Sequence, residues 1–118
     1  MKLKGEVTKG WGSESIWATT DKYCGKMLNF TAGKMFSMHF HAEKEESWVV
    51  LSGRFVVKYI DTANANVIEK KLGVGDIWHN PPLLPHQIIC IESGTILEVS
   101  TADSVEDNYR VMKGDSQK

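Results

Sequence analysis

Residues 33–53 read GKMFSMHFHAEKEESWVVLSG, and this stretch decides how the chain folds. His39 and His41 stand two residues apart in an extended segment, which places both imidazoles on the same face of the expected strand. Glu46 begins an apolar run that is also typical of a strand. A turn between these two strands brings the Glu46 carboxylate to the imidazoles.

A third imidazole would complete a site with three nitrogens and one oxygen for a divalent metal. His86, in the proline-rich segment 80–86, is the candidate. This ligand set suits Zn, Mn, Fe, Ni or Co, and the donors alone do not choose among them. Four protein ligands leave one or two positions open on a five- or six-coordinate ion, as a catalytic metal requires.

Short apolar runs alternate with turn residues along the chain, which predicts an all-β domain. Strands at intervals of about ten residues indicate a sandwich or small barrel. At 118 residues, residues 1–118 form a single domain, with an N-terminal arm over 1–24, a barrel core over about 25–101 and a loose polar tail over 102–118. We expect strands at 15–19, 24–30, 34–41, 46–52, 54–60, 66–72, 76–80, 86–91 and 95–101.

Composition excludes several classes of partner. The net charge of −1 gives no broad basic field for nucleic acid. No apolar run approaches the roughly 18 residues of a membrane span, and the N-terminus lacks the apolar core of a signal peptide. We therefore expect a cytoplasmic protein that binds a small-molecule substrate. Cys24 and Cys90 make no disulfide framework, and we expect both to be reduced and buried.

The strand expected at 34–41 is largely apolar on both faces. Phe36, Met38 and Phe40 share the face opposite the histidines. Because a small barrel has only one inside, the outer face must meet another sheet, the N-terminal arm or a second subunit. On this basis we expect a homodimer.

The pattern resembles the cupin superfamily. Its first motif, G-x5-H-x-H-x3,4-E-x6-G, is matched at every fixed position by Gly33, His39, His41, Glu46 and Gly53. The resemblance implies a double-stranded β-helix, also called a jelly-roll barrel, with one divalent transition metal inside.

The second cupin motif, G-x5-P-x-G-x2-H-x3-N, is matched by Gly75, Pro81 and His86. The chain departs from it at Leu83, where glycine is expected, and at Cys90, where asparagine is expected. The Leu83 change alters the turn that presents His86.

Three further segments resemble the mannose-6-phosphate isomerase type of cupin, which is also fused to sugar-nucleotide pyrophosphorylases. Residues 9–14 are similar to its K-P-W-G-x-E opening, residues 46–53 to its E-x-W-V-V-x-S-G, and residues 97–110 to its E-V…E-D-D-x-x-R ending. Against the isomerase motif Q-x-H-x2-R-x-E-x-W, His39 replaces glutamine and Lys44 replaces arginine. Lysine keeps the charge but loses the planar fork that suits phosphate.

Five other residues are candidates for the pocket. Trp48 is expected to point inward, as a pocket wall or as a plain core residue. His79 and Glu45 are weak candidates for the catalytic base, and His79 lies either in the pocket or on the surface. Lys44 is a solvated turn residue or a contact for an anionic substrate. Arg110 either contacts an anion or belongs to the solvated tail.

Three functions remain open. The first is metal-dependent isomerisation of an aldose and a ketose, with a sugar or sugar phosphate as substrate. The second is an Fe-dependent dioxygenase, since three histidines and a glutamate resemble the oxygen-using cupins. The third is a non-catalytic sugar-binding module.

Overall fold

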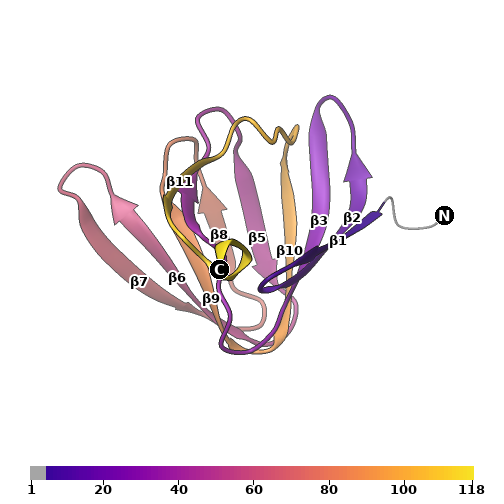
Figure 1. Ribbon diagram of the computed structural model, residues 1–118, viewed down its shortest axis with the longest axis horizontal. Coiled ribbons are helices and arrows are strands. Elements are labelled where there is room, and N and C mark those ends of the chain that lie inside the picture. Colours follow the sequence, from indigo (N-terminus) through magenta and orange to yellow (C-terminus); the bar gives the residue numbers. More distant parts are fainter. Residues whose placement is uncertain (1–4) are drawn as a thin grey trace.

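The computed structural model describes residues 5–118, which form two antiparallel β-sheets and one short 3-10 helix. The first sheet has the strand order β1-β2-β3-β10-β5-β8, and the second has the order β11-β4-β9-β6-β7. The sheets face each other across the interior (Figure 1). The elements are β1 (Gly5–Lys9), β2 (Gly12–Thr19), β3 (Tyr23–Phe30), β4 (Met38–Phe40), β5 (Glu46–Val50), β6 (Arg54–Asp61), β7 (Asn66–Leu72), β8 (Ile77–Asn80), β9 (His86–Glu92), β10 (Gly94–Thr101), β11 (Tyr109–Met112) and η1 (Asp115–Gln117).

This architecture confirms the expected all-β jelly-roll barrel. Along the central strands, alternate residues turn inward, as the period of two requires. In β10, for example, Ile96, Glu98 and Ser100 are buried, whereas Val99 is half exposed. Within the described part of the chain, no helix is long and apolar enough to cross a bilayer.

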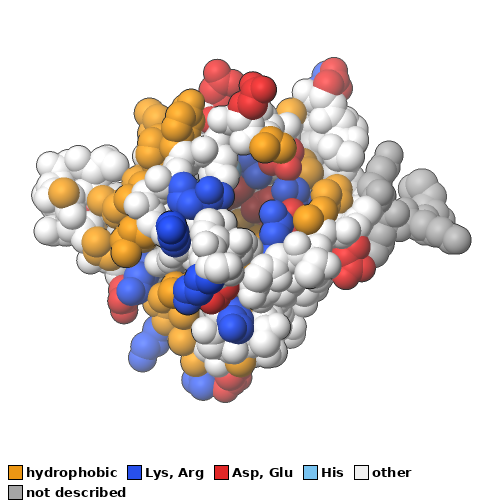
Figure 2. Space-filling model, in the orientation of Figure 1, with side chains coloured by type: hydrophobic (Ala, Val, Ile, Leu, Met, Phe, Trp, Pro, Cys, Tyr) orange, Lys and Arg blue, Asp and Glu red, His pale blue; other side chains and the backbone are white. Residues whose placement is uncertain are grey.

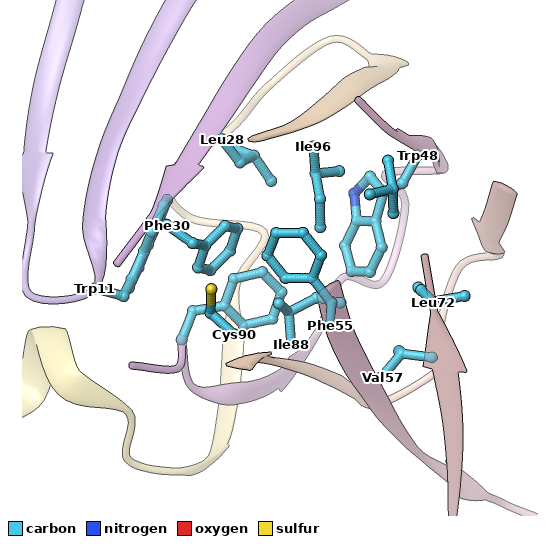
Figure 3. Packing of buried hydrophobic residues seen from close by; sticks show 12 residues of the cluster. Trp11, Leu28, Phe30, Trp48, Phe55, Val57, Leu72, Ile88, Cys90 and Ile96 are labelled. Carbon is cyan, nitrogen blue, oxygen red and sulfur yellow. The ribbon is translucent and has the colours of Figure 1, made fainter. Parts of the chain in front are cut away.

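Aromatic rings fill the closed end of the barrel (Figure 3). Trp11 stacks on Phe30 with ring centroids 4.4 Å apart, and Phe55 meets Phe30 edge to face at 5.3 Å. Burying each such side chain stabilises the fold by about 1.5–3 kcal/mol. Cys24 and Cys90 are both buried and unbridged, as expected, and Cys90 belongs to this core.

The strand predicted at 34–41 is wrong in its extent and in one of its faces. Only Met38–Phe40 is strand, preceded by an isolated bridge between Met35 and Ile89. The irregular backbone turns Phe36 into the core, where its ring lies 5.0 Å from that of His39. Phe36 and Met38 are therefore buried within a single chain.

Residues 103–117 are folded, so the expectation of a loose tail is wrong here. β11 pairs with β4 at the edge of the second sheet. After it, Asp115 accepts a hydrogen bond from the amide of Met35 at 2.7 Å, and Ser116 accepts one from the amide of Gly10 at 3.0 Å. The segment thus reaches both sheets and forms one wall of the opening between them (Figure 1).

Candidate metal centre

Three histidines meet inside the barrel. His39 lies in β4 and His86 in β9, directly opposite each other in the antiparallel pair, and His41 follows β4. One nitrogen from each ring forms a group in which all three atoms lie within 4.8 Å of one another. The structure therefore brings together the three imidazoles that the sequence singled out.

Backbone carbonyls fix the protonation of all three rings. The Nδ1 of His39 donates to Ser37 O at 2.7 Å, that of His41 to Asp107 O at 2.5 Å and that of His86 to Leu84 O at 2.8 Å. A carbonyl oxygen can only accept, so each Nδ1 carries the proton. Metal-binding histidines usually donate one ring N–H to a carbonyl in this way, which leaves the other ring nitrogen to bind the metal.

Burial keeps the imidazoles of His39 and His41 neutral. Burial lowers the pKa of His39 to about 3, and burial also lowers the pKa of His41. Neutral imidazole is the form that binds a metal.

The buried Nε2 of His86 has no hydrogen-bond partner within residues 5–118. A buried nitrogen without a partner is costly, so a ligand there is the natural explanation. The donor set fits a divalent transition metal.

Glu46 lies beside this group, in the first residue of β5. Its Oε1 is 2.9 Å from the Nε2 of His86, in a direction that does not make a hydrogen bond, and accepts a hydrogen bond from Asn80 Nδ2 at 3.1 Å. Burial raises the pKa of Glu46, but His86 and Lys44 outweigh burial and hold that pKa well below its usual range. The carboxylate is ionised and contacts His86, but it is not part of the compact group that the three imidazoles form.

His39 and His41 open onto a cavity of about 400 Å³ between the sheets, whose lining does not include His86. Figure 2 shows both basic and acidic side chains inside a hollow on this face. His39, His41 and Glu46 line it together with Ser37 and other polar residues, including Glu14, Lys26, Lys44, Glu98, Asp103, Asn108, Arg110 and Gln117. The volume suits a small polar molecule.

Lys44 is the centre of an ion-pair network on the cavity wall. Its ammonium lies 3.4 Å from Glu46, 3.7 Å from Glu98 and 3.0 Å from Asp103. Burial lowers the pKa of Lys44, but the three carboxylates outweigh burial and raise it above its usual range. Lys44 is therefore a buried, charged residue of the cavity and not a solvated turn residue.

Asp103 links Lys44 to a second buried lysine. Its Oδ2 lies 2.8 Å from Lys26 Nζ, and Glu14 contacts the same ammonium at 3.6 Å. These two lysines and their carboxylates hold the folded tail against the wall of the first sheet.

Glu98 is a cavity residue to which the sequence analysis gave no role. It is buried in β10, and burial together with the nearby Glu46 raises its pKa to about 8. Trp48 Nε1 donates to its Oε1 at 3.0 Å. The signal in the sequence was a charged residue at an inward position of a strand, between Ile96 and Ser100.

Trp48 does point inward, and its ring centroid lies 5.5 Å from that of His86. It packs in the core behind the histidines and does not line their cavity. Its indole anchors Glu98, which faces the cavity. Trp48 therefore supports the site from behind.

His79 and Glu45 lie elsewhere. Their side chains form an exposed pair with 2.6 Å between His79 Nε2 and Glu45 Oε2, and neither lines the cavity. His79 instead borders a shallow, apolar groove on the outer face of β5, β8 and β10. Arg110 does line the histidine cavity, although its side chain is otherwise exposed.

The turn before His86 places a left-handed residue at Leu83, where the cupin motif has glycine. Leu83 has a φ of +71°, a left-handed conformation that favours glycine. Its amide donates to the carbonyl of His41 at 2.7 Å, which connects the loop before His86 to the end of β4. Leu83 adopts this unfavourable conformation, and the loop places His86 beside His39 and His41.

Comparisons with known proteins agree with this picture. The family model described as Cupin matches residues 3–114. The chain is 25% identical over 113 residues to mannose-1-phosphate guanylyltransferase of Klebsiella pneumoniae, covering 92% of this chain and 24% of that protein. It is 31% identical over 98 residues to the enzyme of the same name from Salmonella muenchen, covering 78% and 20%. The chain thus spans less than a quarter of the length of these relatives.

Solved structures share the fold. The capsular polysaccharide assembling protein CapF from Staphylococcus aureus superposes with a TM-score of 0.79 at 18% identity, over 95% of this chain and 32% of that one. Oxalate decarboxylase from Bacillus subtilis superposes with a TM-score of 0.77 at 19% identity, over 91% and 30%. At these identities the likeness is one of fold alone.

Proposed function

The chain belongs to the cupin family, and from this premise we propose that it is a metal-dependent enzyme that isomerises an aldose and a ketose, with a sugar or sugar phosphate as substrate. One divalent transition metal is held by His39, His41, His86 and Glu46. The observation that carries the proposal is the convergence of three imidazoles, each fixed through Nδ1, beside a cavity that His39 and His41 line. The relatives named for mannose 1-phosphate support a sugar phosphate as the substrate class.

When bound, the metal supplies a Lewis acid for a sugar carbonyl and its neighbouring hydroxyl. The chain's own residues supply the rest. Glu98 is the carboxyl that moves a proton between the carbons, because it lines the cavity and Trp48 fixes its Oε1. Lys44 orients the carboxylates of Glu46 and Glu98 from the wall between them. Phe36 and Trp48 exclude water from behind the imidazoles.

Elemental analysis tests the metal site. We expect near-stoichiometric metal in the wild type and its loss in His86→Ala and in His41→Ala, the second variant being included because His41 is less buried. The matched control is His79→Ala, which removes the fourth histidine of the chain from the outer face and should retain the metal. Absence of metal from wild-type protein after reloading with Zn, Mn, Fe, Ni and Co would overturn the proposal.

Activity is tested by NMR. Metal-loaded protein is incubated in D₂O with hexose and pentose phosphates, and exchange of the C2 proton is followed. We expect exchange for at least one substrate and its loss in Glu98→Gln with the metal retained. If no substrate exchanges, the isomerase assignment fails even if metal is bound.

A second candidate function is an Fe-dependent dioxygenase. The observation that favours it is the imidazole of His39, which stands where the isomerase motif has glutamine. Oxygen uptake by the Fe-loaded protein with small diketone or thiol substrates, above the rate of free Fe, would support it. Binding of sugar by calorimetry without any turnover would instead favour a non-catalytic sugar-binding module.

A further inference from the structure

The cations that line the cavity fall into two groups. Lys26 and Lys44 are buried in the wall, and each forms ion pairs with carboxylates. Lys9 and Arg110 lie nearer solvent and make no ion pair with any residue of the described range 5–118. The rim of the cavity therefore carries two uncompensated positive charges.

These two side chains come from opposite edges of the opening. Lys9 ends β1, the edge strand of the first sheet, and Arg110 lies in β11, the edge strand of the second. Figure 1 shows β1 and β11 on either side of the space between the sheets. A ligand that enters the cavity passes between them.

The strand periodicity directs both side chains to the cavity. Val7 and Lys9 are two residues apart in β1, and both line it. In β11, Tyr109 stacks on Phe40 at 5.1 Å, on the face away from the cavity, so Arg110 takes the opposite face. Arg110 is also the cross-strand partner of His39, which places it next to the metal centre.

The two lysines inside the cavity are already paired. Its wall holds them together with four carboxyl groups, those of Glu14, Glu46, Glu98 and Asp103. Among the cationic side chains that line the cavity, Lys9 and Arg110 are therefore the two left to attract a phosphate group. Neutral donors stand close to the rim, on Ser104, Asn108 and Gln117.

We propose that Lys9 and Arg110 form a phosphate subsite at the mouth of the cavity. It holds the phosphoryl group of a sugar phosphate while the carbonyl end of the same molecule reaches the metal site, where His39 and His41 line the cavity. Arg110 offers a planar fork for two phosphate oxygens, and Lys9 adds a point charge from the other side. The subsite rests on the proposed function in that the phosphorylated molecule is the substrate of the metal centre.

The test is calorimetry of metal-loaded protein with mannose 6-phosphate, mannose and inorganic phosphate. We expect Lys9→Gln and Arg110→Gln each to weaken binding of mannose 6-phosphate by about tenfold or more, which is the usual loss for a hydrogen bond to a charged group. Mannose should bind weakly and equally to all variants. Salt should weaken the binding of the phosphorylated sugar.

Lys113→Gln is the matched control, because Lys113 follows β11 and does not line the cavity. It should bind like the wild type. Unchanged affinity in Lys9→Gln and Arg110→Gln, or no binding of mannose 6-phosphate and inorganic phosphate at millimolar concentration, overturns the subsite. Failure of the isomerase assignment is separate, since it would show as binding of mannose 6-phosphate without exchange of the C2 proton of any sugar phosphate.

Discussion

Leu83 is one of two non-glycine residues in the described range 5–118, with Ala65, that have a positive φ. Its φ of +71° costs a residue with a Cβ roughly 1–2 kcal/mol, and its exposed side chain regains little from packing. We expect Leu83→Gly to raise the free energy of unfolding by roughly 0.5–1 kcal/mol, because glycine relieves the strain but adds entropy to the unfolded chain.

Chemical denaturation measures the effect of this change. Val74→Gly is the matched control, since Val74 is also exposed in a turn but has no positive φ. It should destabilise the protein. A Leu83→Gly protein less stable than the wild type would show that the leucine contributes packing that its exposure hides.

Lys44 stabilises the fold, whereas the backbone conformation of Leu83 destabilises it. Lys44→Met leaves Glu46, Glu98 and Asp103 without their shared cation, and removing one partner from a buried ion pair costs about 3–5 kcal/mol. Lys58→Met is the control, because Lys58 pairs with Glu69 at 3.3 Å on a partly exposed surface and such pairs contribute about 0–1 kcal/mol.

A double variant separates charge from shape. Lys44→Met with Glu46→Gln removes the buried carboxylate that stays ionised beside Lys44, so we expect it to recover more than 1 kcal/mol of the loss in urea denaturation. If the double variant is no more stable than Lys44→Met, the loss comes from packing of the lysine stem.

At the scale of the element, Asp107 joins the tail to the metal centre. Its carboxylate accepts hydrogen bonds from the amides of Ala42, Glu43 and Lys44 at 2.6, 3.1 and 2.9 Å, and its carbonyl fixes the His41 ring. Asp107→Ala frees the loop that carries His41. We expect a 10- to 100-fold loss of metal affinity, the usual effect of losing an outer-shell partner.

Competition with a chelator measures that affinity. Glu106→Ala is the matched control, because Glu106 is the exposed neighbour of Asp107 and makes no ion pair among the described residues. Equal affinity in both variants would show that the loop holds its shape without the aspartate.

The sequence predicted most strands to within about two residues, including the edge strands β7 and β8, but it missed the edge strands β1 and β11. Where one face of a strand is buried, apolar residues alternate and the strand can be recognised, as in β10, predicted at 95–101 and observed at Gly94–Thr101. The edge strand β11 is exposed at all four residues and carries no such alternation, so it was missed. β1 was missed for the same reason.

The site residues could be predicted where local spacing groups them, and could not be placed where their position depends on residues far along the chain. The spacing of His39, His41 and Glu46 is local, and it was enough to group them. The burial of Lys44 depends on Asp103, 59 residues further along the chain, and no local pattern could predict that contact. The placement of His79 on the outer face depends on the strand register of Ser47 with His79, which the sequence did not show.

At the scale of the whole molecule, low pH should weaken the ion pairs of Asp103 with Lys26 and Lys44, which hold residues 103–117 against the barrel. Burial raises the pKa of Asp103, but Lys26 and Lys44 outweigh burial and lower it to about 2, against an ordinary value of 3.8. A carboxyl whose pKa is lower in the folded state stabilises the fold above its unfolded pKa, and this contribution disappears as the pH falls towards 2.

Denaturation of the metal-free protein at pH 7, 5 and 3 tests this. We expect Asp103→Asn to be less stable than the wild type at pH 7 and to lose less stability than the wild type between pH 5 and 3. Parallel pH profiles for the two proteins would contradict the assignment. Because Asp103 is partly exposed, solvent screens the effect and its size is modest.

The homodimer stays a prediction. The strand face that suggested a dimer is not exposed, since Phe36 and Met38 are buried within one chain. Large exposed apolar side chains lie instead on the outside of the first sheet, among them Ile77 and Val99. Light scattering at micromolar concentration gives the mass of the particle in solution.

The hydrogen bond from His41 to the carbonyl of Asp107 has a consequence for biogenesis. The two residues are 66 positions apart, so the ribosome must release a long stretch of polypeptide after His41 before that ring can be oriented. Closing so distant a contact is slow compared with forming hairpins. A nascent barrel would therefore exist for a time with only part of its ligand set in place, and the metal would be captured late, by a nearly finished protein, rather than acting as the nucleus around which the strands assemble.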